Sequence, residues 1–211
     1  MANTNKNDYN KLAPFYDWLG HTLYFGAIER SQLAYLDAIP KGRRILFIGG
    51  GTGFLIDEVL ETCRPSELIY IEKSAIMIHK SKKACKHDLK ERVTFIHGTQ
   101  EDLVDGEKYD AVLSFFFFDQ FRFPTLSKIF LQLDSHLKPG GLWLWSDFIP
   151  PETWWQKILM RTMLLFFDLT TSLGTNRVYS VPEIIMKREY LLQQESFFYG
   201  GFIRSVVLKK P

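Results

Sequence analysis

Apolar and polar positions alternate along the chain in blocks that predict strands and helices in turn. Short apolar runs are followed by stretches with helical spacing, and this order repeats up to about residue 150. The predicted strands are Arg44–Ile48, Leu68–Ile71, Val93–His97, Asp110–Phe116, Leu142–Ser146, Tyr190–Phe198 and Phe202–Lys209, and the predicted helices are Phe54–Cys63, Ser74–Asp88, Thr125–Leu137, Trp154–Leu169 and Pro182–Lys187. The pattern indicates an α/β fold built around a mostly parallel sheet.

Glycine and proline refine this picture at two places. The turn Lys138-Pro139-Gly140-Gly141 is expected to end a helix before the fifth strand. Gly200-Gly201 lies between the last two strand-like runs and predicts a hairpin, so an antiparallel pair should close the sheet.

Composition is that of one soluble domain. The chain has 211 residues, of which 46% are hydrophobic and 24% charged, with a net charge of +2. Its lysine-rich stretch has no interleaved aromatic residues, which disfavours nucleic-acid binding. Cys63 and Cys85 form no CxxC pattern and the N-terminus has no apolar core, so we expect a cytoplasmic protein with reduced thiols. Charged residues interrupt Trp154–Leu169, which argues against a transmembrane segment.

The stretch ILFIGGGTGFL, residues 45–55, carries the strongest chemical signal. Gly49, Gly50, Gly51 and Gly53 lie between a predicted strand and a predicted helix. Free amides at a helix start form an anion site, and glycine lets a ligand touch the backbone. The Gly-Lys-Ser/Thr ending of a phosphate loop is missing, and Phe54 stands where the dinucleotide fingerprint needs its third glycine.

Glu72 ends the second predicted strand, 21 positions after Gly51. A carboxylate there can accept two hydrogen bonds from a ribose diol. Together with the glycines it predicts an adenosine-containing ligand. The alternative is a tight turn beside a solvated glutamate.

These motifs together resemble the class I S-adenosylmethionine-dependent methyltransferases. ILFIGGGTGFL looks like the first motif of that family, LIYIEKS like the second, YDAVLSFFFFDQF like the strand-four motif, and LDSHLKPGGLWLWSDF like its helix and fifth strand. The opening YNKLAPFYDWL is similar to the N-terminal segment of the quinone-biosynthesis and phospholipid methyltransferases.

The resemblance implies a Rossmann-like three-layer sandwich with a mostly parallel seven-stranded sheet, an antiparallel C-terminal strand and an N-terminal helical lid. Residues 1–211 would form one domain, with a lid at 1–40, a cofactor-binding core at 41–149, a substrate-side insertion at 150–180 and C-terminal strands at 181–211. The cofactor would be S-adenosylmethionine, with S-adenosylhomocysteine as product.

The family's cofactor contacts carry over residue by residue. They fall on Tyr9, Tyr16, Gly49, Gly50, Gly51, Gly53, Glu72, Lys73, Thr99, Gln100, Glu101 and Phe115. The two tyrosines would cover the cofactor, Glu72 would hold the ribose, and the main chain of Phe115 would lie near the methionine amino group. The sequence departs from the family at the third strand, where Gly98-Thr99-Gln100-Glu101 replaces Gly-Asp-Ala, so Thr99 or Gln100, or a shifted acid, must reach the adenine.

Methyl transfer needs alignment and a dry site more than a catalytic side chain, and no spacing in the sequence suggests a metal. Asp119 is the first candidate base, because four phenylalanines precede it and burial should raise the pKa of its carboxyl. A capping role for Asp119 stays open. His21 is the second candidate base. Asp147, expected just after the fifth strand, favours a cap or loop role.

The insertion helix has too many apolar residues for one buried stripe. We expect part of it to face an apolar or aromatic small molecule, methylated on oxygen or carbon, with a homodimer or a peripheral membrane contact as other uses of that surface. Amine N-methylation, as in phospholipid methyltransferases, and a non-catalytic, cofactor-binding partner subunit are the competing functions.

Overall fold

The computed structural model describes residues 26–121, 123–170 and 188–211, and the side chains of residues 163–170 are not described. Its strands are β1 (Arg44–Ile48), β2 (Glu67–Glu72), β3 (Val93–His97), β4 (Tyr109–Phe115), β5 (Leu137–Phe148), β6 (Leu191–Phe198) and β7 (Ile203–Lys209). Its α-helices are α2 (Ala27–Leu33), α3 (Ile56–Cys63), α4 (Ala75–Ala84), α5 (Phe123–His136) and α6 (Trp154–Thr170). The predicted short helix Pro182–Lys187 lies outside the described residues.

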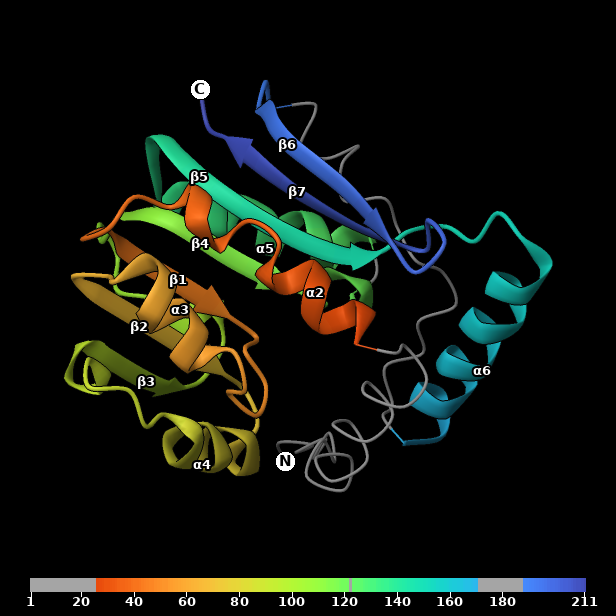
Figure 1. The fold of residues 1–211 in the computed structure, drawn as a ribbon, viewed down its shortest axis with the longest axis horizontal. Coiled ribbons are helices and arrows are strands. Elements are labelled where there is room, and N and C mark those ends of the chain that lie inside the picture. Colours follow the sequence, from red (N-terminus) through yellow and green to blue (C-terminus); the bar gives the residue numbers. More distant parts are fainter. Residues whose placement is uncertain (1–25, 122, 171–187) are drawn as a thin grey trace, which may run out of the picture.

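All the strands join one sheet in the order β3-β2-β1-β4-β5-β7-β6 (Figure 1). β3, β2, β1, β4 and β5 pair in parallel, while β7 runs antiparallel to both β5 and β6. The predicted mostly parallel sheet with an antiparallel C-terminal strand is therefore confirmed.

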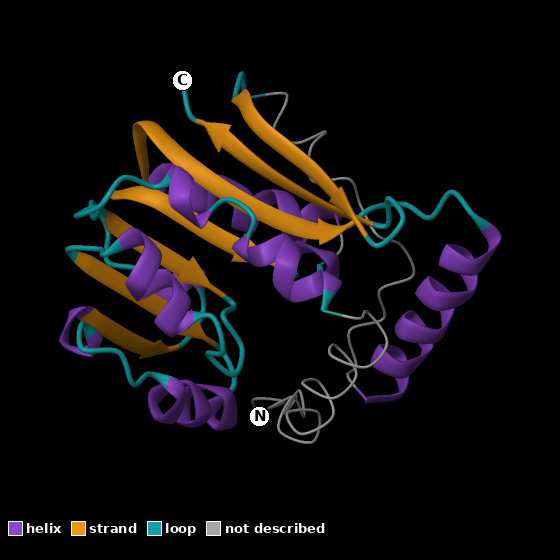
Figure 2. Cartoon of the chain, viewed as in Figure 1, coloured by secondary structure: helices purple, strands orange, loops and turns teal. Residues whose placement is uncertain are grey.

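Helices cover both faces of the sheet because side chains alternate along each strand. In β1, Ile45 and Phe47 pack with α3 and part of α2 and α4, whereas Leu46 and Ile48 pack on the opposite face with α5. Both faces of β1 are thus buried, which explains why it reads as a continuous apolar run. Figure 2 shows the resulting three layers, with helices in purple on either side of the orange strands.

The Lys138–Gly141 turn is the main correction to the predicted elements. It lies within β5, which begins at Leu137 directly after α5 rather than at Leu142. The pairing of β5 with β4 skips residues there, from Tyr109↔Leu137 to Ala111↔Leu142. Gly140 N–H donates to the Lys210 carbonyl at 3.1 Å, so the last residues of the chain satisfy the irregular backbone. At its other end β5 continues to Phe148 and so includes Asp147, because β7 pairs with it along that length.

The first turn of α6 is fastened to the β6–β7 hairpin. Gln156 is buried, and its side chain accepts hydrogen bonds from two main-chain amides before the helix and donates to the Gly200 carbonyl at 3.0 Å. The Trp155 ring packs edge-on against Tyr199. From this anchor α6 extends beyond the end of the sheet at which the hairpin turns (Figure 1), and Trp154 and Ile158 are exposed. Whether this surface serves an acceptor, a membrane or a dimer stays a prediction.

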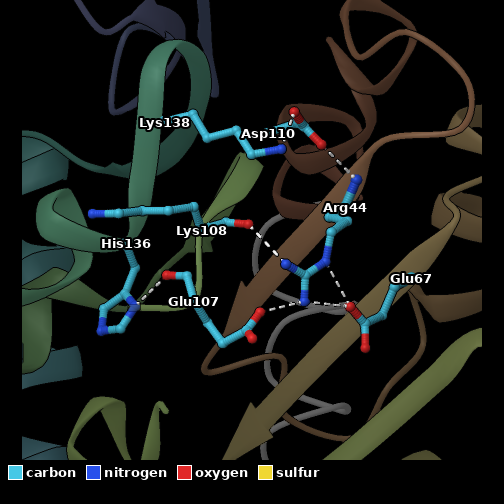
Figure 3. Close-up of polar contacts among 7 residues, drawn as sticks. All are labelled: Arg44, Glu67, Glu107, Lys108, Asp110, His136 and Lys138. Carbon is cyan, nitrogen blue, oxygen red and sulfur yellow. Dashed lines mark hydrogen bonds and ion pairs between the residues drawn. The ribbon is translucent and has the colours of Figure 1, made fainter. Parts of the chain in front are cut away.

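A charged network joins the amino ends of three parallel strands (Figure 3). The Arg44 guanidinium donates to Glu67 at 2.8 Å and to Glu107 at 2.6 Å, and the Arg44 main-chain N–H donates to Asp110 at 2.9 Å. Lys138 also donates to Asp110, at 2.8 Å. The network lies at the edge of the sheet opposite to the glycine turn, so its role is to hold β1, β2 and β4 in register.

Candidate functional site

The glycine turn follows β1 at the carboxyl edge of the sheet. Gly51 lies at its centre with a φ of +64°, a conformation that suits glycine. Its N–H donates to Glu72 Oε2 at 3.1 Å, and its carbonyl accepts from the Tyr70 hydroxyl at 3.0 Å. Gly51 is thus held at both its N–H and its carbonyl by side chains of β2.

At each of the other three glycines, a neighbouring group of the protein leaves no room for a side chain. A Cβ added at Gly49 would lie 2.5 Å from the Phe117 ring, and one at Gly50 would lie 2.3 Å from the Tyr70 ring. A Cβ at Gly53 would lie 2.6 Å from a main-chain carbon of α4. Of these four glycines, Gly51 is the one at which a Cβ would meet no atom of the described residues within 4 Å. The space next to Gly51 is therefore the part of the turn that a ligand can approach.

Glu72 ends β2 and is 9% exposed. Besides Gly51, it accepts a hydrogen bond from the Ser74 main-chain N–H at 2.7 Å. Burial raises the pKa of this carboxyl, while the main-chain donors oppose the shift because they favour the charged form. Its position beside the open side of the turn fits a ribose-holding role.

The proposed adenine side is formed after β3. The Thr99 side chain accepts from the Glu101 N–H, and Asp102 accepts from the Thr99 N–H at 2.7 Å, so these two residues cap a single 3-10 turn. Glu101 is exposed and lies 3.7 Å from Lys128. Gln100 is buried. Of the residues predicted for this contact, Thr99 is already used in the turn, and Gln100 stays the better candidate.

Lys73 directly follows β2, and Phe115 is the last residue of β4. The Lys73 carbonyl is within hydrogen-bonding distance of His97 Nε2, at 3.1 Å. Phe115 is 4% exposed, and its ring packs against Phe47 with centroids 5.8 Å apart. Its side chain therefore belongs to the core, which leaves its main chain for the predicted contact.

The segment after β4 lies against the glycine turn. Phe117 is the neighbour that a Cβ at Gly49 would strike. Phe116 has a φ of +49°, a conformation that a bulky residue adopts only where its surroundings impose it, and its N–H donates to the Ser146 carbonyl at 2.7 Å. Strain of this kind gathers at functional sites.

Asp119 follows in the short 3-10 helix η4 (Phe118–Gln120). The residue is half-buried, and its Oδ1 is fully buried with no hydrogen-bond partner among the described residues. Burial raises the pKa of its carboxyl from 3.8 to about 7, partly opposed by the Gln120 N–H. The structure thus accounts for the predicted rise in the pKa of Asp119, while its catalytic role stays a prediction.

Asp147 faces this residue from β5, although the sequence suggested a cap or loop position. It is 1% exposed and accepts from the Asp119 N–H at 3.3 Å and from the Phe148 N–H at 2.9 Å. Burial, and then repulsion by Asp119, raise the pKa of this second carboxyl well above its usual value.

Sequence reasoning missed Tyr70 and the pairing of Asp147 with Asp119. Tyr70 stands two positions before Glu72, on the same face of β2, so strand periodicity could have placed it near the turn. No local signal could have placed Asp147 beside Asp119, since the two lie 28 positions apart. Tyr9, Tyr16 and His21 lie outside the described residues. Within the part of the chain that the structure describes, no cluster of His, Cys, Asp and Glu could hold a metal ion, and no helix there reaches the length and hydropathy needed to cross a membrane.

The residues fit the cofactor that the motifs imply. The open side of Gly51 leaves room for a ligand against the main chain, and the Glu72 carboxylate beside it is an acceptor for two hydroxyl groups. A side chain larger than glycine at position 51 would fill that space.

Comparison with known proteins agrees with this geometry. The methyltransferase domain family matches residues 46–143, from β1 to β5. A malonyl-[acyl-carrier protein] O-methyltransferase of Halalkalibacterium halodurans is 31% identical over 161 residues, which are 72% of this chain and 57% of that protein. Another, from Ilyobacter polytropus, is 36% identical over 104 residues, or 49% of this chain and 39% of its own length. The chain thus spans about half the length of these curated relatives or less.

Solved structures share the fold at low identity. An O-methyltransferase family protein from Burkholderia thailandensis superposes with a TM-score of 0.73 at 15% identity, over 96% of this chain and 60% of that one. The complex of the Haloferax volcanii Trm112 methyltransferase activator with a methyltransferase gives a TM-score of 0.72 at 14% identity, over 99% of this chain and 100% of that one. The N-methyltransferase NodS of Bradyrhizobium japonicum with S-adenosylhomocysteine gives 0.64 at 12%, over 87% and 86%. Residues 46–143 thus match a methyltransferase domain family, and the glycine turn, Glu72 and the strand order agree with that likeness.

Proposed function

We propose that this protein transfers a methyl group from S-adenosylmethionine to an oxygen of a small apolar acceptor. The observation that carries the proposal is the turn around Gly51, with its open side and the buried Glu72 beside it. Such a turn is built to hold an adenosine-containing ligand against the backbone.

When bound, S-adenosylmethionine supplies a methyl group on a positively charged sulfur. The chain itself binds and orients. Glu72 would hold the ribose hydroxyls and the Gly51 main chain would lie against the methionine part, while Phe115, at the carboxyl end of β4, lies at the same edge of the sheet. Holding donor and acceptor in an attack geometry lowers the barrier by roughly 7–11 kcal/mol.

Oxygen is the favoured acceptor atom because the curated relatives named above are O-methyltransferases. The buried ring of Phe117 next to the turn favours an apolar acceptor and a site that excludes water. A malonyl group on an acyl carrier protein, the acceptor in the names of those relatives, belongs in any test, beside phenols and quinones.

Amine N-methylation is the second candidate. The structural likeness to NodS, named an N-methyltransferase, favours it, as does the resemblance of YNKLAPFYDWL to the phospholipid methyltransferases. A partner subunit that binds the cofactor without turnover is the third candidate. The Haloferax complex shows that a related fold works with an activator protein.

Two measurements separate these functions. Titration calorimetry should show binding of S-adenosylmethionine and S-adenosylhomocysteine, and none of NAD. Heat of binding from NAD alone would contradict the assignment of S-adenosylmethionine as the cofactor. Transfer of labelled methyl to a panel of phenols, quinones, malonyl-carrier protein and amines should then label a hydroxyl-type or other oxygen acceptor. Labelling of amines alone would establish the second candidate, and binding without any transfer would establish the third.

A further inference from the structure

Two aspartates, one half-buried and one buried, lie together at the carboxyl ends of β4 and β5. Asp119 belongs to the turn directly after β4, and Asp147 to the last part of β5. Oδ2 of Asp147 accepts the Asp119 N–H at 3.3 Å, and its Oδ1 accepts the Phe148 N–H at 2.9 Å. Asp147 is 1% exposed. The main chain of one aspartate is therefore fastened to the side chain of the other.

The two carboxyls differ in how their oxygens are used. Both oxygens of Asp147 accept main-chain N–H groups. Oδ1 of Asp119 is buried and has no partner among the described residues. Buried polar atoms are nearly always hydrogen-bonded, and a catalytic role is one explanation for an exception. Among the described residues, no donor satisfies this oxygen, which leaves it able to take a proton.

Among the described residues, no cation compensates the two acids. Of the described groups that act on Asp147, the charged side chain is Asp119 itself, and the others are main-chain amides. For Asp119, the main-chain N–H of Gln120 opposes the rise in pKa that burial causes. Two neighbouring carboxylates repel each other in an apolar site, so we expect the pair to hold one proton between its two members near neutral pH.

The pair lies close to the cofactor turn. Phe117, two positions before Asp119, contacts the turn so closely that a Cβ at Gly49 would lie 2.5 Å from its ring. Phe118, between them, is completely buried. The unpaired oxygen thus belongs to a segment that packs on the glycine turn.

Resting on the proposed function, we infer that Asp119 and Asp147 act as one proton-sharing pair that takes up the proton of a neutral hydroxyl acceptor, an alcohol or a phenol. The hydroxyl oxygen forms a bond to the methyl carbon, and the carbon–sulfur bond breaks with its electron pair going to sulfur. The hydroxyl proton passes to Oδ1 of Asp119. The positive charge of the sulfonium and the negative charge of the singly protonated pair are both removed. Asp119 would be the catalytic base, and Asp147 the positioning residue.

This assignment narrows the acceptor class. A carboxylate acceptor carries no proton to remove, and a negatively charged pair repels it. A neutral hydroxyl needs a base and is not repelled. Hydroxyl acceptors should therefore depend on the pair, and carboxylate acceptors should not.

The first test requires no acceptor. The protein is labelled with ¹³C at the aspartate side-chain carboxyl carbon, and NMR follows its titration. Asp119→Asn and Asp147→Asn assign the two signals, and Asp105→Asn, at an exposed loop position, is the matched control. We expect two coupled steps, the later one well above the usual pKa of about 3.9, and a single, earlier step in each Asn variant. Two independent titrations near 3.9 in the unaltered protein would overturn the pair.

The second test measures methyl transfer in single turnover with phenol acceptors. Asp119→Asn should slow transfer by roughly 10²–10⁴-fold, and Asp147→Asn should shift the pH midpoint of the rate. Neither change should alter the affinity for S-adenosylmethionine. Equal rates for Asp119→Asn and the unaltered protein would overturn the pair alone. Failure of the unaltered protein to bind S-adenosylmethionine would overturn the proposed function, whatever the titration shows.

Discussion

Asp119→Asn should change how the stability of the protein depends on pH. In the folded state, burial raises the pKa of the Asp119 carboxyl from 3.8 to about 7. In the unfolded chain the carboxyl returns to its ordinary value. Between these two values the folded state binds a proton that the unfolded state releases. The free energy of unfolding therefore falls as the pH rises from about 4 to about 7.

The expected size follows from the shift itself. A change from 3.8 to about 7 is about three pKa units, and each unit corresponds to about 1.4 kcal/mol. Asp119 should thus cost the folded state about 4 kcal/mol above pH 7, with almost no cost below pH 4. Asparagine has nearly the same shape and no charge to bury, so the Asn variant should be more stable than the unaltered protein at pH 8.

The assay is urea unfolding at several pH values between 4 and 8. The quantity of interest is the difference in free energy of unfolding between the Asn variant and the unaltered protein. Asp147 adds a pH dependence to both proteins, but its contribution shrinks in the variant because the neighbouring charge is gone. Asp105→Asn, at an exposed position, serves as the control and should give a flat difference. A difference that is also flat for Asp119→Asn would refute the reasoning, since the carboxyl would then be solvated in the folded state.

Three further changes test the turn and the sheet. Gly51→Val should abolish S-adenosylmethionine binding in calorimetry. Gly42→Val, at a position that shares the positive φ and open surroundings, should keep it. An equal loss of binding in both variants would mean that backbone strain and not ligand access is responsible. Tyr70→Phe removes the hydroxyl that donates to Gly51. It should weaken the binding of S-adenosylmethionine by about 2–10-fold, because the lost hydrogen bond is worth roughly 0.5–1.5 kcal/mol. An unchanged Kd would mean that Glu72 alone holds the turn. Arg44→Met should lower the free energy of unfolding by about 1–2 kcal/mol, and by less at high salt, because the Arg44 guanidinium is partly exposed. The same change should leave the affinity for S-adenosylmethionine unchanged. A loss of affinity would contradict the placement of the Arg44 network at the opposite edge of the sheet.

The sequence by itself determined the elements and the cofactor turn, since both depend on local patterns. Apolar runs that alternate with helical spacing placed every strand except β5 to within one residue at either end. Gly51 and Glu72 could be singled out because each stands at the end of a buried strand, and parallel strands end at the same edge of a sheet. The hairpin at Gly200-Gly201 was likewise readable from its turn residues.

Tertiary structure alone decided which neighbour each of these residues has. Four glycines in one turn suggested a single ligand-driven cause, yet three of them are small because Phe117, Tyr70 and α4 pack on them. The Lys138–Gly141 segment reads locally as a stop signal, but the chain end pairs with it and makes it part of β5. Asp147 was unremarkable in the sequence, and it matters because β5 lies next to β4 and places its carboxyl beside Asp119. Contacts of this kind join residues far apart in the chain, and the pKa of a carboxyl depends on the burial and charges that only such contacts create.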